Sequence, residues 1–335
     1  MSETVSPRIA RVRILELPYS ADREYDYEIP ETLCDAVHKG SLVSVNFGAS
    51  QRRIALVVDV LQSSEYDKLK PVLAVADDRF SLDEELLGLC MFLRERTFAS
   101  TGEAVGAILP PGVTKLFGHT RHDPVERSYS LAMKPDDDTI RRLSKPARSA
   151  IELLAGGELT ERRLGDSGVS RAVLRNLVAK GIVSVKSAEV YRNPYAGRAT
   201  AQVDDSLNDE QRQASDTLCA LADTHEARAA LLYGVTGSGK TRVIKSVIDR
   251  VLASGRGVIL LVPEISLTGQ TVDYFCGCYG DRLAVIHSSL SEGERVDAWK
   301  RIRAGQADVV IGTRSAIFAP VKRLGLIVID EEQEH

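Results

Sequence analysis

Short apolar runs separated by polar turns fill the first 78 residues of the chain. They are rich in β-branched side chains and lie at residues 9–17, 42–47, 54–60 and 72–76. Runs of this kind are typical of strands. Their close spacing predicts a compact barrel-like or sheet domain of about 100 residues.

Apolar positions change to helical spacing in residues 81–99, where Ser81 and Glu84 offer a capping box at the start. Residues 102–112 are typical of a turn, and Pro110-Pro111-Gly112 marks its end. The polar residues 118–138 are expected to be linker and loop. We therefore place the end of the N-terminal domain at residue 112.

The middle of the chain has the order of a winged helix. Helices are predicted at 146–155, 160–164 and 169–181, followed by a strand at 182–185 that would open a β-hairpin. Ser170 is the expected N-cap of the third helix. Arg171 and Arg175 share one face of that helix, which would be the recognition helix. Contact with DNA and a plain protein–protein role both remain open.

Strands and helices alternate in the last third, which predicts a parallel sheet with helices on both faces. Strands are expected at 229–233, 257–262, 282–286, 308–312 and 326–330, and helices at 209–221, 241–253, 268–276 and 292–303. The polar residues 193–206 before this region are expected to be a second linker.

The first of these strands runs into LLYGVTGSGKT, residues 231–241, which fits the G-x-x-x-x-G-K-[ST] pattern of a phosphate-binding loop. Glycines let backbone N–H groups surround phosphate oxygens, and the following helix directs its positive end at the anion. A flexible Gly-Ser turn is the alternative. The expected nucleotide contacts are Gly234, Thr236, Gly237, Ser238, Gly239, Lys240 and Thr241, with Lys240 on the β- and γ-phosphates and Thr241 on Mg²⁺.

A second carboxylate site fits this loop. The apolar strand LIVI at 326–329 ends in Asp330 and Glu331. Asp330 would hold Mg²⁺ through water, and Glu331 is the candidate base for the attacking water. An acidic turn after a buried strand is the simpler alternative.

Composition and charge narrow the class of protein. The chain has 335 residues, a net charge of −4 and no apolar run near the ~18 residues of a membrane span. Its five scattered cysteines favour a reducing cytoplasm. Residues 1–110 carry 12 Lys and Arg against 18 Asp and Glu, while residues 111–205 carry 16 against 12. The middle segment therefore favours contact with a polyanion more than the N-terminal domain does.

Tyr25, Asp26 and Tyr27 place a carboxylate between two aromatic rings. Such rings can stack on a base, and a carboxylate can accept hydrogen bonds from a base edge. The alternative is a pair of tyrosines that pack as ordinary strand residues.

The motifs together resemble a known family. The segment LNDEQ at 207–211 resembles the adenine-reading Q motif of superfamily 2 helicases, through Gln211. GVTGSGKT, LVPEISLTGQT, HSSLSEGER, IGTRSAIFAP and VIDEE resemble the PriA family of bacterial replication-restart helicases. The resemblance is dense over residues 207–335, and residues 25–27, 47–48 and 69–70 fall at that family's pocket for the three-prime end of DNA.

This resemblance implies a multidomain protein. Its expected parts are a β-rich DNA-binding domain at 1–112, a winged helix at 113–195, a linker at 196–206 and a partial RecA-like α/β lobe at 207–335. The complete enzyme would use ATP and Mg²⁺ to unwind DNA from three-prime to five-prime at abandoned forks. Expected DNA contacts are Tyr25, Asp26, Tyr27, Gly48, Lys70, Arg171, Arg175 and Arg314. Expected partners are forked DNA with a nascent three-prime end, single-stranded DNA, single-stranded DNA-binding protein and helicase-loading primosome proteins.

Two departures from the family pattern matter. Gln333 stands where the family commonly has histidine, and the chain ends at His335, before a second lobe and the family's zinc-binding cysteines. We therefore expect a fragment that binds DNA, with weak or absent ATP binding and no helicase activity. The alternatives are a fork-binding module with a vestigial lobe and another superfamily 2 DNA translocase.

Overall fold

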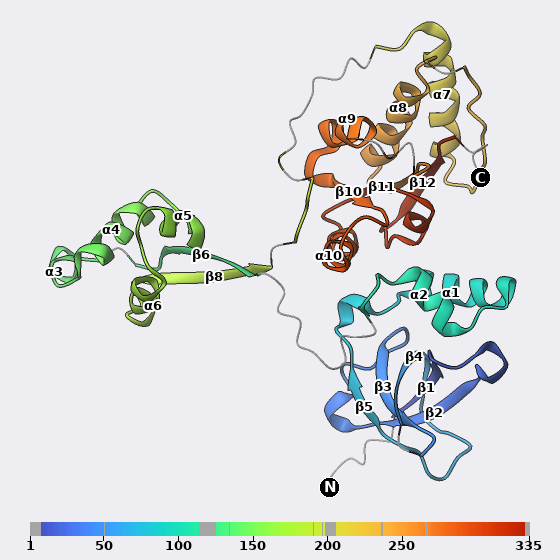
Figure 1. Ribbon diagram of the computed structural model, residues 1–335, viewed down its shortest axis with the longest axis horizontal. Helices are drawn as coiled ribbons and strands as arrows, with labels where there is room; N and C mark the ends of the chain where they lie inside the picture. The colour runs from blue at the N-terminus through green and yellow to red at the C-terminus, as the bar shows by residue number, and fades with distance from the viewer. Residues whose placement is uncertain are drawn as a thin grey trace. The chain divides into compact units, whose positions relative to one another are not determined.

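The computed structural model describes residues 8–49, 51–113, 125–133, 135–189, 191–195, 197, 206–235, 237–264, 267 and 269–331. The chain forms two compact units, one of residues 1–119 and 192–335 and one of residues 120–191. Figure 1 shows the elements of each unit. Single 3₁₀ turns lie at η1 (Tyr19–Ala21), η2 (Glu31–Leu33), η3 (Asp78–Phe80), η5 (Gly280–Arg282) and η6 (Arg314–Phe318).

The N-terminal strands form one antiparallel sheet. They are β1 (Arg8–Ile14), β2 (Glu24–Ile29), β3 (Leu42–Phe47), β4 (Gln51–Leu61) and β5 (Val72–Val75), in the order β2-β1-β4-β3-β5. A bridge between Glu28 and Pro71 joins the two edge strands, so the sheet closes into a barrel. Alternate side chains such as Val12, Val43 and Val57 fill its interior. The predicted β-rich domain is confirmed.

Two helices cover the outside of this barrel, α1 (Glu84–Thr97) and α2 (Thr101–Ile108). Their buried residues join Leu15, Leu42 and Leu56 in a second core. The expected helix start at Ser81 is wrong, because the Asp83 side chain caps the Leu86 N–H while the Ser81 hydroxyl donates to the Asp78 carbonyl.

The turn expected at 102–112 is also wrong, because most of it is helix α2. Ser100 and Glu103 form a complete capping box that starts the helix. A Cβ at Gly102 would lie 1.8 Å from the Leu15 carbonyl oxygen. That glycine therefore permits close packing of the helix on the end of β1, rather than interrupting the helix.

The unit of residues 120–191 contains β6 (Val125–Leu131), α3 (Asp137–Arg141), α4 (Lys145–Leu154), β7 (Leu159–Thr160), α5 (Glu161–Asp166), α6 (Arg171–Ala179) and β8 (Val183–Glu189). β6 occupies part of the segment expected to be linker. It pairs with β8 along its whole length, so β8 is joined to a strand that precedes the helices and not to a following hairpin strand. Tyr129 on β6 is buried among the helices, and this burial favours the strand over a solvated loop.

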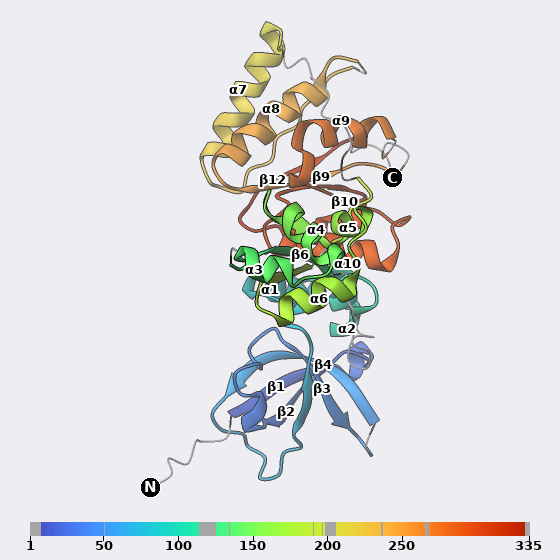
Figure 2. The ribbon, with the colours of Figure 1, turned by 90° about the vertical axis from the view of Figure 1, so that its left-hand side faces the viewer.

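The last third is a parallel sheet of β9 (Gly257–Leu261), β10 (Leu283–Ile286), β11 (Val309–Gly312) and β12 (Leu324–Ile329), in the order β10-β11-β9-β12. One face packs on α8 (Lys240–Ala253) and α9 (Gly269–Tyr279), and the other on α10 (Glu292–Arg303). Helix α7 (Asp209–Asp223) runs beside α8 (Figure 2). The predicted parallel α/β arrangement is confirmed.

The strand expected at 229–233 is wrong. These residues have no regular structure, and the side chains of Leu231 and Tyr233 are 74% and 91% exposed. On the edge strand β12, Ile327 and Ile329 are also exposed. An apolar run forms a strand when pairing with a neighbouring strand and burial of its side chains stabilise it. The side chains of residues 229–233 gain little burial.

Candidate functional site

The candidate phosphate loop closes on the N-terminus of α8. Gly237 and Gly239 both have left-handed backbone, with φ of +79° and +81°. The Lys240 ammonium donates to the Gly234 and Val235 carbonyls at 2.7 and 3.3 Å. Lys240 therefore folds back over the loop, where it donates to the Gly234 carbonyl and shares the Val235 carbonyl with the Ser238 N–H. Thr236 lies outside the described residues.

Gln211 joins helix α7 to this loop. Its Oε1 accepts from the Asn208 N–H at 3.0 Å as half of a capping box, while its Nε2 donates to the Ser238 carbonyl at 2.9 Å. A Cβ at position 239 would come within 2.5 Å of Gln211 Nε2, so a side chain there would displace the Gln211 amide, and the positive φ itself favours glycine. The structure thus brings Gln211 to the candidate phosphate loop, and it gives this side chain a contact that the motif did not predict.

The two candidate carboxylates follow β12. The Asp330 N–H donates to the Leu261 carbonyl at 2.9 Å, which continues the strand pairing with β9. The Asp330 side chain accepts from the Glu331 N–H at 3.1 Å, and Glu331 itself has a positive φ of 50°. Within the described part of the chain, Asp330 makes no hydrogen bond or ion pair with Lys240.

Arg314 begins η6 at the carboxyl end of β11, and its side chain is exposed. Gly312 lets the end of β11 lie close to both β10 and the turn, because a Cβ there would lie 2.2 Å from the Ile286 carbonyl oxygen and 2.7 Å from the Ala316 Cβ. The backbone therefore presents an arginine at the sheet edge where parallel strands end.

Strand β2 separates the three residues of the Tyr-Asp-Tyr segment between its two faces. Tyr27 is buried in the barrel, where its hydroxyl donates to the Asn46 carbonyl at 3.1 Å, and burial raises its pKa. Tyr25 is half-buried and meets the Phe47 ring edge-on, with centroids 5.0 Å apart. Of the two rings, the ring of Tyr25 is the one within reach of a ligand.

Asp26 points away from both rings and is already paired. It accepts from Arg11 Nε at 2.9 Å and from the Ser64 hydroxyl at 2.7 Å, and its side chain is 3% exposed. The Arg11 hydrogen bond is the main cause that holds the pKa of Asp26 below its usual range. This carboxylate is ionised at neutral pH and has few free acceptor positions.

Gly48 and Lys70 do come together. The Lys70 ammonium donates to the Gly48 carbonyl at 2.7 Å, and the Lys70 carbonyl accepts from the Glu28 N–H at 3.0 Å, where the barrel closes. Gly48 follows Phe47, the partner of Tyr25. An ammonium, a half-exposed ring and a glycine backbone thus gather from β2, the β3–β4 turn and the segment before β5.

In the smaller unit, α6 presents Arg171 and Arg175 to solvent while Leu174 and Leu177 face the core. Arg171 forms an ion pair with Glu161, which Arg127 also approaches at 3.8 Å. The charge of Arg171 is therefore partly neutralised within this unit.

Two family models match the chain, one before and one after the unit of residues 120–191. A family described as the 3′ DNA-binding domain of PriA matches residues 14–110, and one described as the type III restriction enzyme res subunit matches residues 204–333. The chain matches an N-terminal portion of the PriA family. The resemblance predicted from the motifs is confirmed.

Relatives carry the printed name replication restart protein PriA. Those of Bacillus subtilis and Chlamydia trachomatis are each 32% identical, over 93% and 92% of this chain. That of Treponema pallidum is 48% identical over 38% of the chain. The chain spans only 47% and 42% of the length of the first two relatives. None of the helices among the described residues is long and apolar enough to cross a membrane.

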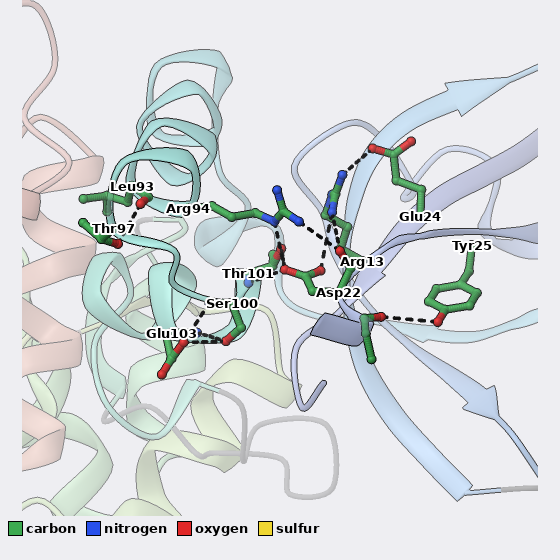
Figure 3. Close-up of polar contacts among 11 residues, drawn as sticks. Arg13, Asp22, Glu24, Tyr25, Leu93, Arg94, Thr97, Ser100, Thr101 and Glu103 are labelled. Carbon is green, nitrogen blue, oxygen red and sulfur yellow. Dashed lines mark hydrogen bonds and ion pairs between the residues drawn. The ribbon is translucent and has the colours of Figure 1, made fainter. Parts of the chain in front are cut away.

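The sequence did not predict one buried hydrogen-bond network of the N-terminal domain. Asp22 is 5% exposed and accepts from the Thr101 N–H and hydroxyl, both at 2.7 Å, and from Arg94 Nε at 3.0 Å (Figure 3). Burial works to raise the pKa of Asp22, but these hydrogen bonds outweigh it and the pKa is lowered. Because Arg94 and Thr101 lie more than 70 residues from Asp22 in the sequence, no local sequence pattern predicts these hydrogen bonds.

Proposed function

We propose that this chain binds the three-prime end of DNA through its N-terminal barrel and, more weakly, ATP through the loop before α8, as part of a replication-restart DNA helicase that moves three-prime to five-prime. The match of residues 14–110 to a 3′ DNA-binding domain carries the proposal. That range contains Tyr25, Gly48 and Lys70, which lie close together where the barrel closes.

At the DNA end, the half-exposed ring of Tyr25 would stack on the terminal base, which is a sequence-tolerant contact. The Lys70 ammonium, now on the Gly48 carbonyl, would turn to a backbone phosphate. Asp26 would reach a base edge only by giving up a hydrogen bond from Arg11 or Ser64. Tyr27 would act through packing alone.

The loop residues fit ATP with Mg²⁺. Two left-handed glycines, an ammonium and a helix N-terminus would form a cradle for the phosphates. Lys240 would exchange the Gly234 and Val235 carbonyls for phosphate oxygens, and Gln211 would hold the loop while reading adenine. Bound Mg²⁺ would neutralise phosphate charge, with Thr241 and Asp330 as its protein contacts. Glu331 would orient the attacking water.

The remaining elements extend the DNA contact. Arg314 would bind the phosphates of the single strand. The unit of residues 120–191 would act as a winged helix with Arg175 as its freer cation, since Arg171 is engaged by Glu161. Single-stranded DNA-binding protein and a helicase loader would be partners of the whole protein.

A fork-binding module with an idle lobe is the second candidate. The exposed segment before the phosphate loop favours it, because Leu231 and Tyr233 make no strand that could fix the loop on the sheet. A different DNA translocase is the third, and the res-subunit match over residues 204–333 is compatible with it.

One binding experiment tests the proposal. Anisotropy is measured for the full chain with a labelled fork whose nascent strand ends at the branch in a free three-prime hydroxyl, and with the same fork carrying a three-prime phosphate. We expect the free end to bind at least about tenfold more tightly, and Lys70→Ala to reduce that binding. Equal affinities for both forks would contradict the assignment of the N-terminal barrel as the site that recognises the three-prime end. ATP turnover stimulated by the fork would exclude the idle-lobe candidate.

A further inference from the structure

Phe98 ends helix α1 in a backbone conformation that suits glycine. Its φ and ψ are 54° and 27°, in the left-handed region, and its side chain is 73% exposed. A bulky residue with positive φ is uncommon, and glycine or asparagine is favoured at this helix position. The ring neither relieves the backbone nor fills the core, so packing does not account for an aromatic residue here.

Tyr19 in η1 stands beside this ring. The Tyr19 and Phe98 centroids are 6.0 Å apart with an interplanar angle of 83°, and Tyr19 is itself 39% exposed. The Arg94 guanidinium lies 5.0 Å from the centre of the Tyr19 ring. Two exposed rings and one cation therefore form a single surface, which we call the Tyr19–Phe98 platform.

A buried network fixes the orientation of the platform. Arg94 donates through Nε to the Asp22 carboxylate and through Nη2 to the Asp22 carbonyl, both at 3.0 Å (Figure 3). The same carboxylate accepts from Thr101 at the start of α2. The Arg94 guanidinium, which lies on the Tyr19 ring, is thus held in place from within the domain.

The platform is connected to the candidate DNA-end site. The Tyr25 hydroxyl approaches the Ala21 carbonyl at 3.5 Å, and exposed Arg23 lies over the Tyr25 ring at 5.2 Å. Tyr19 and Ala21 belong to the same 3₁₀ turn. The two aromatic surfaces are therefore the two ends of one short segment, inside the range that matches a 3′ DNA-binding domain.

Local charge permits a nucleic acid but makes stacking the dominant contact. The acidic residues of the segment are each paired with an arginine: Asp22 with Arg13 and Arg94, Glu24 with Arg13, and Asp26 with Arg11. Residues 1–110 nevertheless carry 12 basic against 18 acidic residues, so general attraction for phosphates is weak. Base–ring contact would have to supply the affinity, and it does so for any base.

We infer that the Tyr19–Phe98 platform stacks an unpaired base of single-stranded DNA close to the three-prime end held by the barrel. This inference rests on the proposed DNA-end function. It adds a second contact, for a nucleotide other than the terminal one.

Phe98→Gly separates binding from folding. Glycine removes the ring and suits the left-handed backbone, so the thermal midpoint should be unchanged or higher. Binding to a labelled duplex with a four-nucleotide three-prime tail should weaken about fivefold or more, because a stacked base contributes on that order. The factor should be similar at 50 and 200 mM salt, since no phosphate contact is lost. Phe98→Asn, which also tolerates this backbone, should behave alike.

Phe92→Ala is the matched control, because Phe92 is another exposed aromatic of α1, at 54%. Its affinity should stay within twofold of wild type. In a further series, an abasic site replaces each tail nucleotide in turn. At one position it should lower the affinity of wild type as much as Phe98→Gly does, and at that position it should not lower the affinity of Phe98→Gly further.

Three outcomes overturn the inference. If Phe98→Gly binds the tail like wild type, the platform has another occupant, such as a protein. If Phe92→Ala lowers the affinity for the tail as much as Phe98→Gly does, the base does not bind specifically at the Tyr19–Phe98 platform. If wild type does not bind the tail at all, the proposed DNA-end function fails together with the inference.

Discussion

In the N-terminal barrel, a buried carboxylate holds the segment that leads to Tyr25, whereas in the parallel lobe the segment that leads to Lys240 lies in solvent. Asp22 is 5% exposed and receives hydrogen bonds from two helices, while Tyr233 is 91% exposed. Tyr25, a candidate DNA-end residue, therefore follows a segment that buried hydrogen bonds hold in place. The candidate phosphate loop is shaped by its glycines and by Gln211, and residues 229–233 before it form no strand.

This difference has a functional consequence. A preorganised site binds without an ordering cost, but a loop that must settle on a sheet loses part of its binding free energy to that ordering. We accordingly expect the chain to recognise DNA ends more readily than ATP. Each prediction below perturbs one side of this comparison.

Removing the buried support should have the largest effect. Asp22→Ala leaves Arg13 and Arg94 without their shared carboxylate, and loss of one partner of a buried charged network costs about 3–5 kcal/mol. Urea unfolding of the full chain, followed by a signal from the N-terminal domain, measures this. The exposed Asp35→Ala should change stability by less than about 0.5 kcal/mol. A similarly small effect for Asp22→Ala would mean that the network does not support the domain.

Protonation of Asp22 at low pH should weaken the same buried network. Because the folded pKa of Asp22 lies below its ordinary value of 3.8, its contribution is complete above that pH and is lost as the pH falls through the lower, folded value. Wild type should therefore lose stability between pH 5 and pH 2 more steeply than Asp22→Asn, in thermal melts across that range. Parallel pH profiles for the two proteins would refute the assignment.

On the other side of the comparison, Lys240→Ala should weaken ATP binding by at least about tenfold, the scale of one hydrogen bond to a charged group. Affinity for forks without nucleotide should be unchanged. Lys245→Ala, on the same helix and paired with Asp249, serves as the control in calorimetry with ATP and Mg²⁺. If both variants bind ATP like wild type, the nucleotide lies elsewhere.

The smallest effect is expected at the link between α7 and the loop. Gln211→Glu keeps the capping box with Asn208, because glutamate serves there equally well. It loses the donor to the Ser238 carbonyl. Thermal stability should stay within about 0.5 kcal/mol while ATP affinity falls by about fivefold. A change in stability with no change in affinity would make Gln211 a purely structural cap.

Periodicity predicted most of the elements, because barrel strands and lobe helices each bury one regular face. It failed where the deciding contact is distant. Helix α2 begins on its own capping box, but its glycine at 102 is explained only by the Leu15 carbonyl, which lies just after β1 and far away in the sequence. Strand β6 exists because β8, more than 50 residues away, pairs with it.

The candidate sites show the same limit. The shape of the candidate phosphate loop follows from local sequence, because glycines permit its left-handed backbone, while its nucleotide contacts stay a prediction. The alternation of β2 placed Asp26 and Tyr25 on opposite faces, but the pairing of Asp26 with Arg11 and Ser64 depends on neighbouring strands. The apolar run at 229–233 was predicted to be a strand because composition does not reveal whether a sheet edge will pair with it and bury its side chains.

Amide hydrogen exchange on the full chain tests the central difference most directly. The Thr101 N–H, which donates to buried Asp22, should exchange at the rate set by unfolding of its domain. Residues 231–233 should exchange at nearly unprotected rates without nucleotide. Protection of residues 231–233 equal to that of β12, or rapid exchange at Thr101, would contradict the contrast between the buried support of the candidate DNA-end site and the exposed segment before the candidate phosphate loop.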